Sequence, residues 1–539
     1  MNKKKSTLIL VLFLLGIFMG AIDSGIVSPA RELIQNSFQV SRSVGTWMIT
    51  LYTLVYAVSM PIVSKMADRS GYKKVYIFGI AMFGLGSLLC GLANFYGTFT
   101  FFLFARVIQA IGAGGIMPIA NSVIGKSFPE EKRGTALGMV GAIYGVATIL
   151  GPTMGSGILS AAGNNHWGWI FFINVPISIV IILLSFALED SKSNERKPMD
   201  LAGSIIVAAV VGTLMYALTN LDFFNFVSSI KSAEVYPFII ASIIFLPILI
   251  IVESKAKDPV LNMKYFKNTQ IVVVLVLAFI VGIGMMGMVF VPQFAENALK
   301  LKAGSGGYLV TLLAVFSGVA APVSGILLDK KGAKLVLILG FIFNIIGTLF
   351  LGFVATQQLS FITVLIGLAF MGFGVGFTMG APLNYLILGA VPQEEGTTAL
   401  ATMSLIRSIG VTISPSIMIG FIVNAGSKVQ QNIMALFPAN ISAMSQGKGN
   451  GQIFSSLQSS DVTTIVDDLV KAIGQINLGK YSEAAVKGIN SARAAIESTF
   501  QTTMNNGYRS MFTATAIIAA AGFIAALFLN GKKQSKQNL

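Results

Sequence analysis

The sequence is poor in cysteine, histidine and charged residues. It contains one cysteine, Cys90, and one histidine, His166, in 539 residues. A single cysteine excludes an internal disulfide framework and a metal site built from cysteines. A single histidine argues against a histidine-rich metal site and against a histidine-based proton relay. Only 11% of the residues are charged, whereas soluble domains carry about 25%, so the chain is not a set of soluble globular domains.

Long apolar runs are what the sequence has instead. Hydrophobic residues make up 54% of the chain, and its mean hydropathy is +0.78. Because the runs are continuous and do not alternate with polar residues, they predict membrane-spanning helices and not a β-barrel. We therefore expect an all-α integral membrane protein, with each run near the ~20 residues that a helix needs to cross a bilayer. The fourteen runs lie near 7–29, 44–64, 75–94, 98–125, 135–160, 168–188, 201–219, 236–252, 270–294, 306–328, 334–355, 360–389, 397–424 and 510–530.

The basic residues gather in alternate loops between these runs. The formal net charge is +15, which taken alone would suggest a nucleic-acid partner. If the N-terminus is cytoplasmic, however, most lysines and arginines fall in inside segments, and the short outside loops hold only Arg31, Arg42, Lys231, Lys300 and Lys302. This positive-inside bias predicts a multi-pass protein of the cell membrane with both termini in the cytoplasm and no nucleic-acid partner. The long apolar start is expected to be a retained first helix and not a cleaved signal peptide.

One carboxylate, Asp23, lies well inside an apolar run. A charge at that depth costs roughly 2.5–3.5 kcal/mol on insertion scales, so it needs a partner, a water-filled cavity or a proton. Arg106 in the fourth run is a natural counter-charge because a buried arginine stays protonated, and Arg407 in the penultimate run is a second candidate. Burial favours the protonated acid and a nearby arginine favours the ionised one, so a balance between them would place its titration near neutral pH. A fixed structural Asp–Arg pair is the alternative.

Two stretches of the sequence repeat at one offset. The segment 64–71, which ends in Asp-Arg-Ser-Gly, aligns with 325–332, 261 residues further on. A proline and a later Pro-x-Glu pattern repeat at nearly the same offset. Two six-helix halves at 1–190 and 266–531, with a helix pair inserted at 191–265, explain this spacing. Such repeats place a substrate site near the bilayer midplane, between the halves.

A polar segment interrupts the pattern of short loops. Residues 425–509, between the last two runs, are rich in serine, asparagine, glycine and alanine and are expected outside the cell. Within them, Ile465, Leu469 and Ile473 recur at helical spacing. A small helical hairpin and a flexible loop both remain open for this segment.

The loop after the second run carries a charged motif with a glycine. Gly71 permits a tight turn with positive φ, and Asp68 can accept hydrogen bonds from the N-terminus of a neighbouring helix. The basic residues of the motif hold the loop at the cytoplasmic face. Forming and breaking such a cluster would bias an inward–outward equilibrium, whereas a plain charged turn is the alternative. The gate residues predicted from both copies of the motif are Asp68, Arg69, Gly71, Lys73, Asp329 and Gly332.

Small residues mark the fifth run. Gly141 with Gly145 and Gly151 with Gly155 form two pairs at i, i+4, which gives a bare face for close packing of helices. Pro152 lacks a backbone donor and is expected to kink the helix. For most of these glycines, a role in packing alone is the alternative.

These segments resemble the major facilitator superfamily, and within it the fourteen-helix drug:H+ antiporters. The resemblance covers the chain apart from 425–509 and implies two six-helix halves plus two inserted helices. In this superfamily the Gly-Pro pair of the fifth helix marks exporters, and the acid of the first-helix pattern Asp-x-x-Ile-Val is implicated in coupling or cation recognition. The matching residues are Asp23, Ile26, Val27, Asp68, Arg69, Gly71, Arg106, Gln109, Gly151, Pro152, Gly155, Trp167, Trp169, Asn174, Pro176, Gly396, Arg407 and Gly410.

Several other residues are candidates for the lining of a substrate cavity. Tyrosine, methionine and phenylalanine side chains suit a loose apolar cavity, and a stripe of hydroxyls lies beside Arg407. Placement in the core or against lipid is the alternative for each of them. The candidates are Tyr52, Tyr56, Gln109, Met286, Phe290, Ser404 and Ser408.

The function expected from these features is proton-coupled export of amphipathic drugs, cationic ones among them, by alternating access. This is multidrug efflux of the kind that confers antibiotic resistance. Its partners would be a small amphipathic substrate, protons and the lipid bilayer, with no metal or organic cofactor besides the proton gradient, and we expect a monomer. No Gly-x-x-x-x-Gly-Lys-Ser/Thr sequence is present, so a built-in ATP pump is not expected.

Three alternatives remain open. One is export of an endogenous lipid or metabolite, and another is a membrane receptor or scaffold that uses 425–509. The third is a membrane enzyme, which is disfavoured because the runs offer no paired acids, histidine cluster or nucleophile–base set.

Overall fold

The computed structural model describes residues 3–188, 200–256, 258–285, 290–300, 307–434, 436, 465–474 and 482–530. Every regular element in these ranges is a helix, which confirms the all-α prediction. Polar residues at several helix starts supply the missing acceptors. Ser41, Thr98, Asp200 and Ser360 each accept a backbone N–H of the helix that follows, and such caps stabilise a helix by about 1 kcal/mol.

The helices fall into three consecutive groups. The first half comprises α1 (Lys3–Ile26), α2 (Arg31–Ser37), α3 (Arg42–Ser70), α4 (Tyr72–Tyr96), α5 (Phe99–Gly114), α6 (Ile116–Ser127), α7 (Glu130–Ala162), η1 (Asn164–His166), α8 (Trp169–Phe172) and α9 (Asn174–Ser185). The inserted pair comprises α10 (Leu201–Asn220), α11 (Phe226–Ser229), α12 (Tyr236–Lys255) and the short η2 (Met263–Lys267).

The second half comprises the remaining helices. They are α13 (Thr269–Met285), α14 (Val291–Leu299), α15 (Gly307–Lys331), α16 (Ala333–Phe350), the π-helix η4 (Leu351–Ala355), α17 (Phe361–Met379), α18 (Pro382–Gly389), η5 (Gln393–Glu395), α19 (Gly396–Met434), α22 (Ile465–Gly474), α23 (Ser482–Ser491) and α24 (Arg493–Leu527).

Twelve helices among the described residues are long and apolar enough to cross a membrane. Two shorter apolar helices, at 169–185 and 269–285, stand where the sixth and ninth runs were predicted. Each of the fourteen runs thus contains a described helix, while a count of fourteen membrane crossings stays a prediction.

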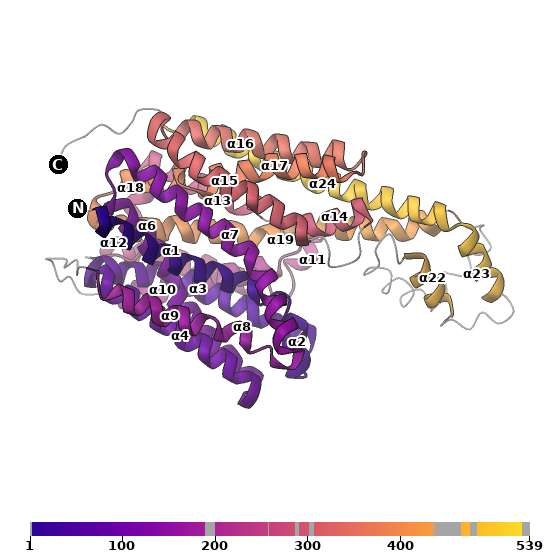
Figure 1. Cartoon of the computed structure of the whole chain (residues 1–539), viewed down its shortest axis with the longest axis horizontal. Helices are drawn as coiled ribbons and strands as arrows, with labels where there is room; N and C mark the ends of the chain where they lie inside the picture. Colours follow the sequence, from indigo (N-terminus) through magenta and orange to yellow (C-terminus); the bar gives the residue numbers. More distant parts are fainter. Residues whose placement is uncertain are drawn as a thin grey trace.

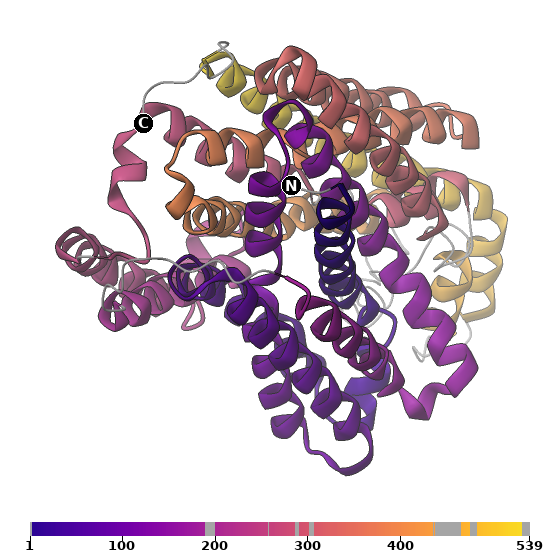
Figure 2. The same cartoon turned by 60° about the vertical axis from the view of Figure 1, so that its left-hand side comes forward.

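The two halves lie side by side and meet along a few helix pairs. Helix α7 packs against α15 and α19 packs against α3, so each half contributes to both contacts. Figure 1 shows the indigo and purple helices of the first half below the salmon and yellow helices of the second half. The inserted pair lies to one side, against α3 and α19, as the pink helices of Figure 2 show.

Helix α1 begins and α24 ends at the same end of the bundle (Figure 1). We call this the basic end, because the turns at Gly71 and Gly332 and their lysines lie there. At the opposite end, α19 and α24 extend beyond the other helices toward α22 and α23 (Figure 1). The buried Ile465 and Leu469 of α22 pack with Ile489 of α23 and Phe500 of α24. A helical pair therefore forms within the predicted outside segment, and α19 and α24 continue into its two margins.

Candidate functional site

Asp23 lies on α1 in the interior of the first half and is fully buried. Its Oδ1 accepts hydrogen bonds from Gln109 Nε2 at 2.7 Å and from Asn174 Nδ2 at 2.9 Å. Its Oδ2 accepts one from Arg106 Nη1 at 3.3 Å, which is also an ion pair. The carboxylate is thus held by α5 and α9 together, and the predicted Asp23–Arg106 pair is present in the structure.

The partners of Asp23 are bonded to one another. Arg106 Nη1 donates to Gln109 Oε1 at 2.6 Å, and its Nε donates to the carbonyl of Met48 at 3.4 Å. Gln109 Nε2 also donates to Ser87 Oγ at 2.8 Å. A connected network of this kind is stronger than its separate bonds because each bond polarises the next in a medium of low dielectric constant. We call the network of Asp23, Ser87, Arg106, Gln109 and Asn174 the acid cluster.

Close helix packing beside Asp23 depends on glycine. A side-chain carbon at Gly25 would come within 2.9 Å of Pro152 Cδ and of the Thr148 carbonyl. A side-chain carbon at Gly151 would come within 2.8 Å of the Ile22 carbonyl, and one at Gly155 would meet the next turn of α1. The glycines of α7 thus allow this helix to lie directly against the turn of α1 that carries Asp23. Pro152 stands in this contact, inside a continuous α7.

The acid cluster differs from the sequence-based picture in two respects. A substrate cavity was expected between the halves, but Asp23 is enclosed by side chains of the first half. Gln109 was expected to line that cavity, but it is fully buried and binds Asp23. Both differences have one cause: an ionised carboxylate in an apolar bundle gathers the nearest donors around it. Ser87 was missed and Asn174 was noted only as part of a motif, although a polar side chain inside an apolar run is itself a signal.

A row of aromatic rings connects the acid cluster with the second half. The guanidinium of Arg106 lies 3.9 Å from the centre of the Tyr52 ring, close enough for a cation–π contact. The rings of Tyr52 and Tyr56 are stacked, with centres 6.2 Å apart and planes within 4°. Tyr56 in turn lies within electrostatic reach of Tyr144 on α7 and of Arg407 on α19. Arg407 is therefore not a partner of Asp23, but it stands at the other end of this row.

The remaining cavity candidates are scattered. Ser404 is buried and Ser408 is half-buried, on the face of α19 near Arg407. Phe290 precedes α14 and packs in the core of the second half. Met286 lies outside the described residues. The structure therefore brings Tyr52 and Tyr56 together with Arg106 and Arg407, and it leaves Phe290 elsewhere.

At the basic end, the side chain of Asp68 in the first half binds a helix of the second half. Its Oδ2 accepts hydrogen bonds from the backbone N–H and the hydroxyl of Thr398, both at 2.8 Å. Thr398 lies in the first turn of α19, where unpaired N–H groups and the helix dipole favour a negative charge. Tyr72 also donates to Asp68, at 3.3 Å, and Lys126 binds the hydroxyl of Tyr72.

Asp329 makes the mirror-image contact. It accepts hydrogen bonds from the backbone N–H groups of Gly134 and Thr135 at 2.8 and 2.9 Å and from the Thr135 hydroxyl at 2.6 Å. Thr135 stands near the start of α7, so each half offers an aspartate to a helix of the other. We call these two contacts the double latch. Asp68 was predicted as an acceptor for a helix N-terminus, and its contact with the first turn of α19 has that geometry. Asp329 instead accepts from the second turn of α7.

The other residues of the motif hold each turn within its own half. Gly71 and Gly332 have φ of 92° and 89°, a region that side chains rarely adopt. Lys73 donates to the carbonyls of Phe186 and Leu188 after α9, both at 2.8 Å. In the second half, Lys334 makes a similar contact with the carbonyls of Leu527 and Leu529 at the end of α24, at 2.7 and 2.8 Å. Arg69 is half-buried beside Asp68.

Helices α7 and α15 touch along a seam of glycines next to the double latch. A side-chain carbon at Gly138 would stand 2.7 Å from the Ala321 carbonyl and 3.2 Å from the Gly325 Cα. Gly141 makes a similar approach to Gly380, whereas Gly145 has more room beside Ser317. The halves are therefore packed backbone to backbone near the basic end.

We expect the Gly138→Val substitution to lower transport at least tenfold, because added atoms in a packed contact cost about 1–3 kcal/mol and force the helices apart. Substrate accumulation in cells that express the variant measures this effect. Gly157→Val is the matched control on the same helix, since a side-chain carbon at Gly157 meets nothing within 4 Å. Equal transport by the two variants would contradict the prediction.

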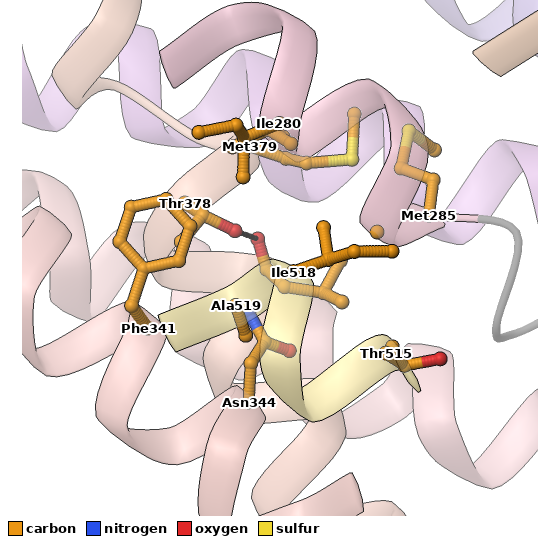
Figure 3. A pocket seen from close by; sticks show the side chains of 12 residues that line it. Ile280, Met285, Phe341, Asn344, Thr378, Met379, Thr515, Ile518 and Ala519 are labelled. Atoms are coloured by element: carbon orange, nitrogen blue, oxygen red, sulfur yellow. Dashed lines mark hydrogen bonds between the residues drawn. The ribbon is translucent and has the colours of Figure 1, made fainter. Parts of the chain in front are cut away.

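The second half has a small cavity in place of an acid cluster. It lies between α13, α16, α17 and α24 and has a volume of about 20 Å³, room for about one water molecule. Figure 3 shows Asn344 and Thr515 at its wall. The offset of the repeat puts Gly284, which also lines the cavity, at the position that Asp23 has in the first half. Among the described residues, a buried carboxylate is thus found in the first half and not in the second.

Within the described residues, no group of three or more histidine, cysteine or acidic side chains is placed to hold a metal ion. His166 is exposed at the end of α7, where its Nδ1 lies 2.9 Å from the Ala162 carbonyl.

Comparison with known proteins places this geometry in context. The sequence profile described as Major Facilitator Superfamily matches residues 13–415. An uncharacterized MFS-type transporter of Bacillus subtilis strain 168, YfiU, is 34% identical over 531 residues, which cover 98% of this chain and 97% of that protein. Multidrug resistance protein 3 of the same strain is 31% identical over 424 residues, 77% and 79% of the two chains. The crystal structure of the human organic anion transporter MFSD10 aligns with a TM-score of 0.57 over 95% of this chain and 99% of its own, at 10% identity, and shares the fold.

Proposed function

This chain belongs to the major facilitator superfamily, and on that premise we propose that it exports amphipathic drugs, cationic ones among them, in exchange for protons. Relatives named as multidrug resistance proteins support export of drugs. The observation that carries the proposal is the acid cluster, in which a single carboxylate is buried with one arginine inside the membrane-spanning bundle.

The acid cluster has two charge states that differ at Arg106. When Asp23 is ionised, its pair with Arg106 is neutral, and the side chains of Ser87, Gln109 and Asn174 complete the hydrogen-bonded network around the pair. When Asp23 takes a proton, Arg106 keeps its charge and loses its counter-ion. That positive charge then lies against Tyr52, at one end of the row of rings that leads to Arg407.

This arrangement makes the proton and a cationic substrate mutually exclusive. A cation near Tyr52 and Tyr56 is attracted by the aromatic faces and by the ionised Asp23. Protonation of Asp23 removes the attraction and leaves the repulsion of Arg106. Competition of this kind is sufficient for exchange, provided that both ligands bind in each orientation of the transporter.

Alternating access requires that the halves separate at each end in turn. We take the basic end as cytoplasmic, in accordance with the positive-inside rule. The double latch and the glycine seam close that end in this structure, so both aspartates have to release their threonines before a substrate enters from the cytoplasm. Asp68 and Asp329 then act as gate residues, and the Lys73 and Lys334 contacts keep each turn in place.

Proton flux in vesicles that contain the purified full-length protein tests this proposal. With an imposed proton gradient, addition of a lipophilic cationic dye should cause the protein to discharge the gradient while the dye accumulates. Protein-free vesicles give the background rate.

The other outcomes separate the alternatives. A response to a lipid or a metabolite, but not to dyes, would replace the substrate class and keep the coupling. No proton movement with any of them would overturn the proposal and favour a binding protein.

A further inference from the structure

The segment that follows α12 reaches both halves at the basic end. We call residues 256 and 258–268 the strap. Asp258 forms an ion pair with Lys65 of α3, in the first half. Asn262 Nδ2 and the Tyr265 hydroxyl both donate to Glu395 Oε2, at 3.1 and 2.8 Å, in the second half.

The strap ends beside the double latch. Glu395 is the last residue of η5 and stands three positions before Thr398, the partner of Asp68. Burial and the Glu395 carboxylate raise the pKa of Tyr265 far above its usual value, so its hydroxyl remains a donor. Opening of the basic end therefore requires the strap to give up its contacts with at least one half.

Glu253 anchors the strap to the inserted pair. It lies in the last turn of α12, is 2% exposed, and its Oε2 accepts a hydrogen bond from the Leu261 N–H at 3.2 Å. Asp200 caps α10 beside it, with Oδ1 accepting from the Gly203 N–H at 2.7 Å. Each carboxyl group thus uses one oxygen to accept a hydrogen bond from a backbone N–H group.

The two remaining oxygens lie around the same point and have no donor. Glu253 Oε1 and Asp200 Oδ2 are buried and have no hydrogen-bond partner. Both lie in the space that a side chain at Gly203 would fill, 2.6 and 2.3 Å from its would-be Cβ, which makes them close neighbours. A buried acceptor without a donor costs about 1–3 kcal/mol, and here two acceptors share one site.

Among the described residues, the charged groups around Glu253 do not supply the missing donor. Asp200 on α10 and Lys65 on α3 act on it electrostatically. Lys65 is bound to Asp258 of the strap, and neither of the two unpartnered oxygens receives a hydrogen bond from it. Two carboxylates side by side in a buried site cannot both ionise at low cost, so one of them keeps a proton.

We propose that Glu253 and Asp200 together bind one proton, as an O–H···O⁻ pair, and that this proton fastens the strap across the basic end. The proton resides on one carboxyl oxygen and is donated to the other, so the pair carries one negative charge. When the proton leaves, two adjacent negative charges repel each other, Glu253 turns away from Asp200, and the Leu261 N–H loses its acceptor. The site is separate from Asp23, and the inference does not depend on the proposed exchange of drugs for protons.

Infrared spectroscopy of the purified full-length protein in lipid tests for the shared proton. The carbonyl stretch of a protonated carboxyl group should be present at mildly acidic pH and should vanish as the pH becomes alkaline. Both Glu253→Gln and Asp200→Asn should remove this signal, while Glu234→Gln should retain it. Glu234 is the matched control because it is exposed and precedes the same helix at its other end. A signal that survives both of the first two substitutions would overturn the proposal.

The amide variants also separate a proton site from a merely structural contact. In each variant an amide N–H replaces the shared proton, so the pair stays bonded at every pH. The wild-type protein should therefore lose thermal stability as the pH rises from about 4.3, the usual pKa of a glutamate, until the shared proton has left the folded protein, whereas Glu253→Gln should not. If that variant does not fold, Asp200→Asn serves the same purpose, because its amide oxygen still caps α10. Equal slopes in wild type and amide variants, or recovery of stability at alkaline pH by added Mg²⁺, would refute the shared proton.

Discussion

The Asp23→Asn variant is expected to lose proton-driven transport almost completely while it still reaches the membrane. Asparagine has the shape of aspartate, and its Oδ1 can still accept from Gln109 and Asn174. What it lacks is the charge opposite Arg106 and the ability to take up a proton. The variant therefore resembles the protonated state permanently. Exchange stops because the proton can no longer bind to and dissociate from this position.

The measurement is the rate at which a proton gradient drives a cationic dye across vesicles that contain the variant. Asp467→Asn is the matched control, since the Asp467 side chain is 59% exposed in α22. Undiminished transport by Asp23→Asn would rule out Asp23 as the coupling site.

Stability has to be separated from coupling in this experiment. A buried ion pair that loses one partner costs about 3–5 kcal/mol, because the other charge is left uncompensated. The double variant Asp23→Asn with Arg106→Gln removes both charges and should recover much of this loss. If it recovers stability and remains uncoupled, the defect of the single variant lies in proton binding and not in folding. Recovery of transport in the double variant would point instead to a fixed structural pair.

The acid cluster also shows what sequence reasoning could and could not reach. The pair of Asp23 and Arg106 was predictable because charges inside apolar runs are rare and expensive. The choice between Arg106 and Arg407 was not predictable, since it depends on which helix faces α1. The enclosure of Asp23 was missed for a related reason. An uncharged donor such as Ser87 or Asn174 costs little free energy inside an apolar helix, so the sequence alone does not mark it as important. Its role becomes visible only when the packed helices place it beside the carboxylate.

The same limit applies to the gate motif and to the inserted pair. The chemistry of Asp68 indicated that it would accept hydrogen bonds from a helix N-terminus, and the repeat indicated a second site at Asp329. The identity of the partners, Thr398 and Thr135, is a long-range contact between halves that no local pattern specifies. Glu253 was overlooked because it ends an apolar run, where a charged residue is ordinarily solvated. Its burial arises from the strap, which folds back over it.

Loss of the double latch is expected to produce the second large effect. In the Asp68→Asn and Asp329→Asn double variant, each contact keeps one acceptor oxygen but loses its negative charge. Hydrogen bonds to charged groups contribute about 1 kcal/mol more than neutral ones, and two contacts on different helices should add. A shift of about 2 kcal/mol changes the balance between closed and open basic ends roughly 30-fold in favour of the open form.

Accessibility of a buried position at the basic end measures this balance. Asn121 is 2% exposed and accepts a hydrogen bond from Asn384 of the other half at 3.3 Å. A cysteine introduced as Asn121→Cys should react with a thiol reagent only when the halves separate, and Cys90 is buried and provides the unlabelled background. Each single Asp→Asn variant should raise labelling, and the double variant should raise it by about the product of the two. If neither substitution changes the labelling, the glycine seam of α7 and α15 is sufficient to close the basic end without the aspartates. The aspartates would then be ordinary helix caps.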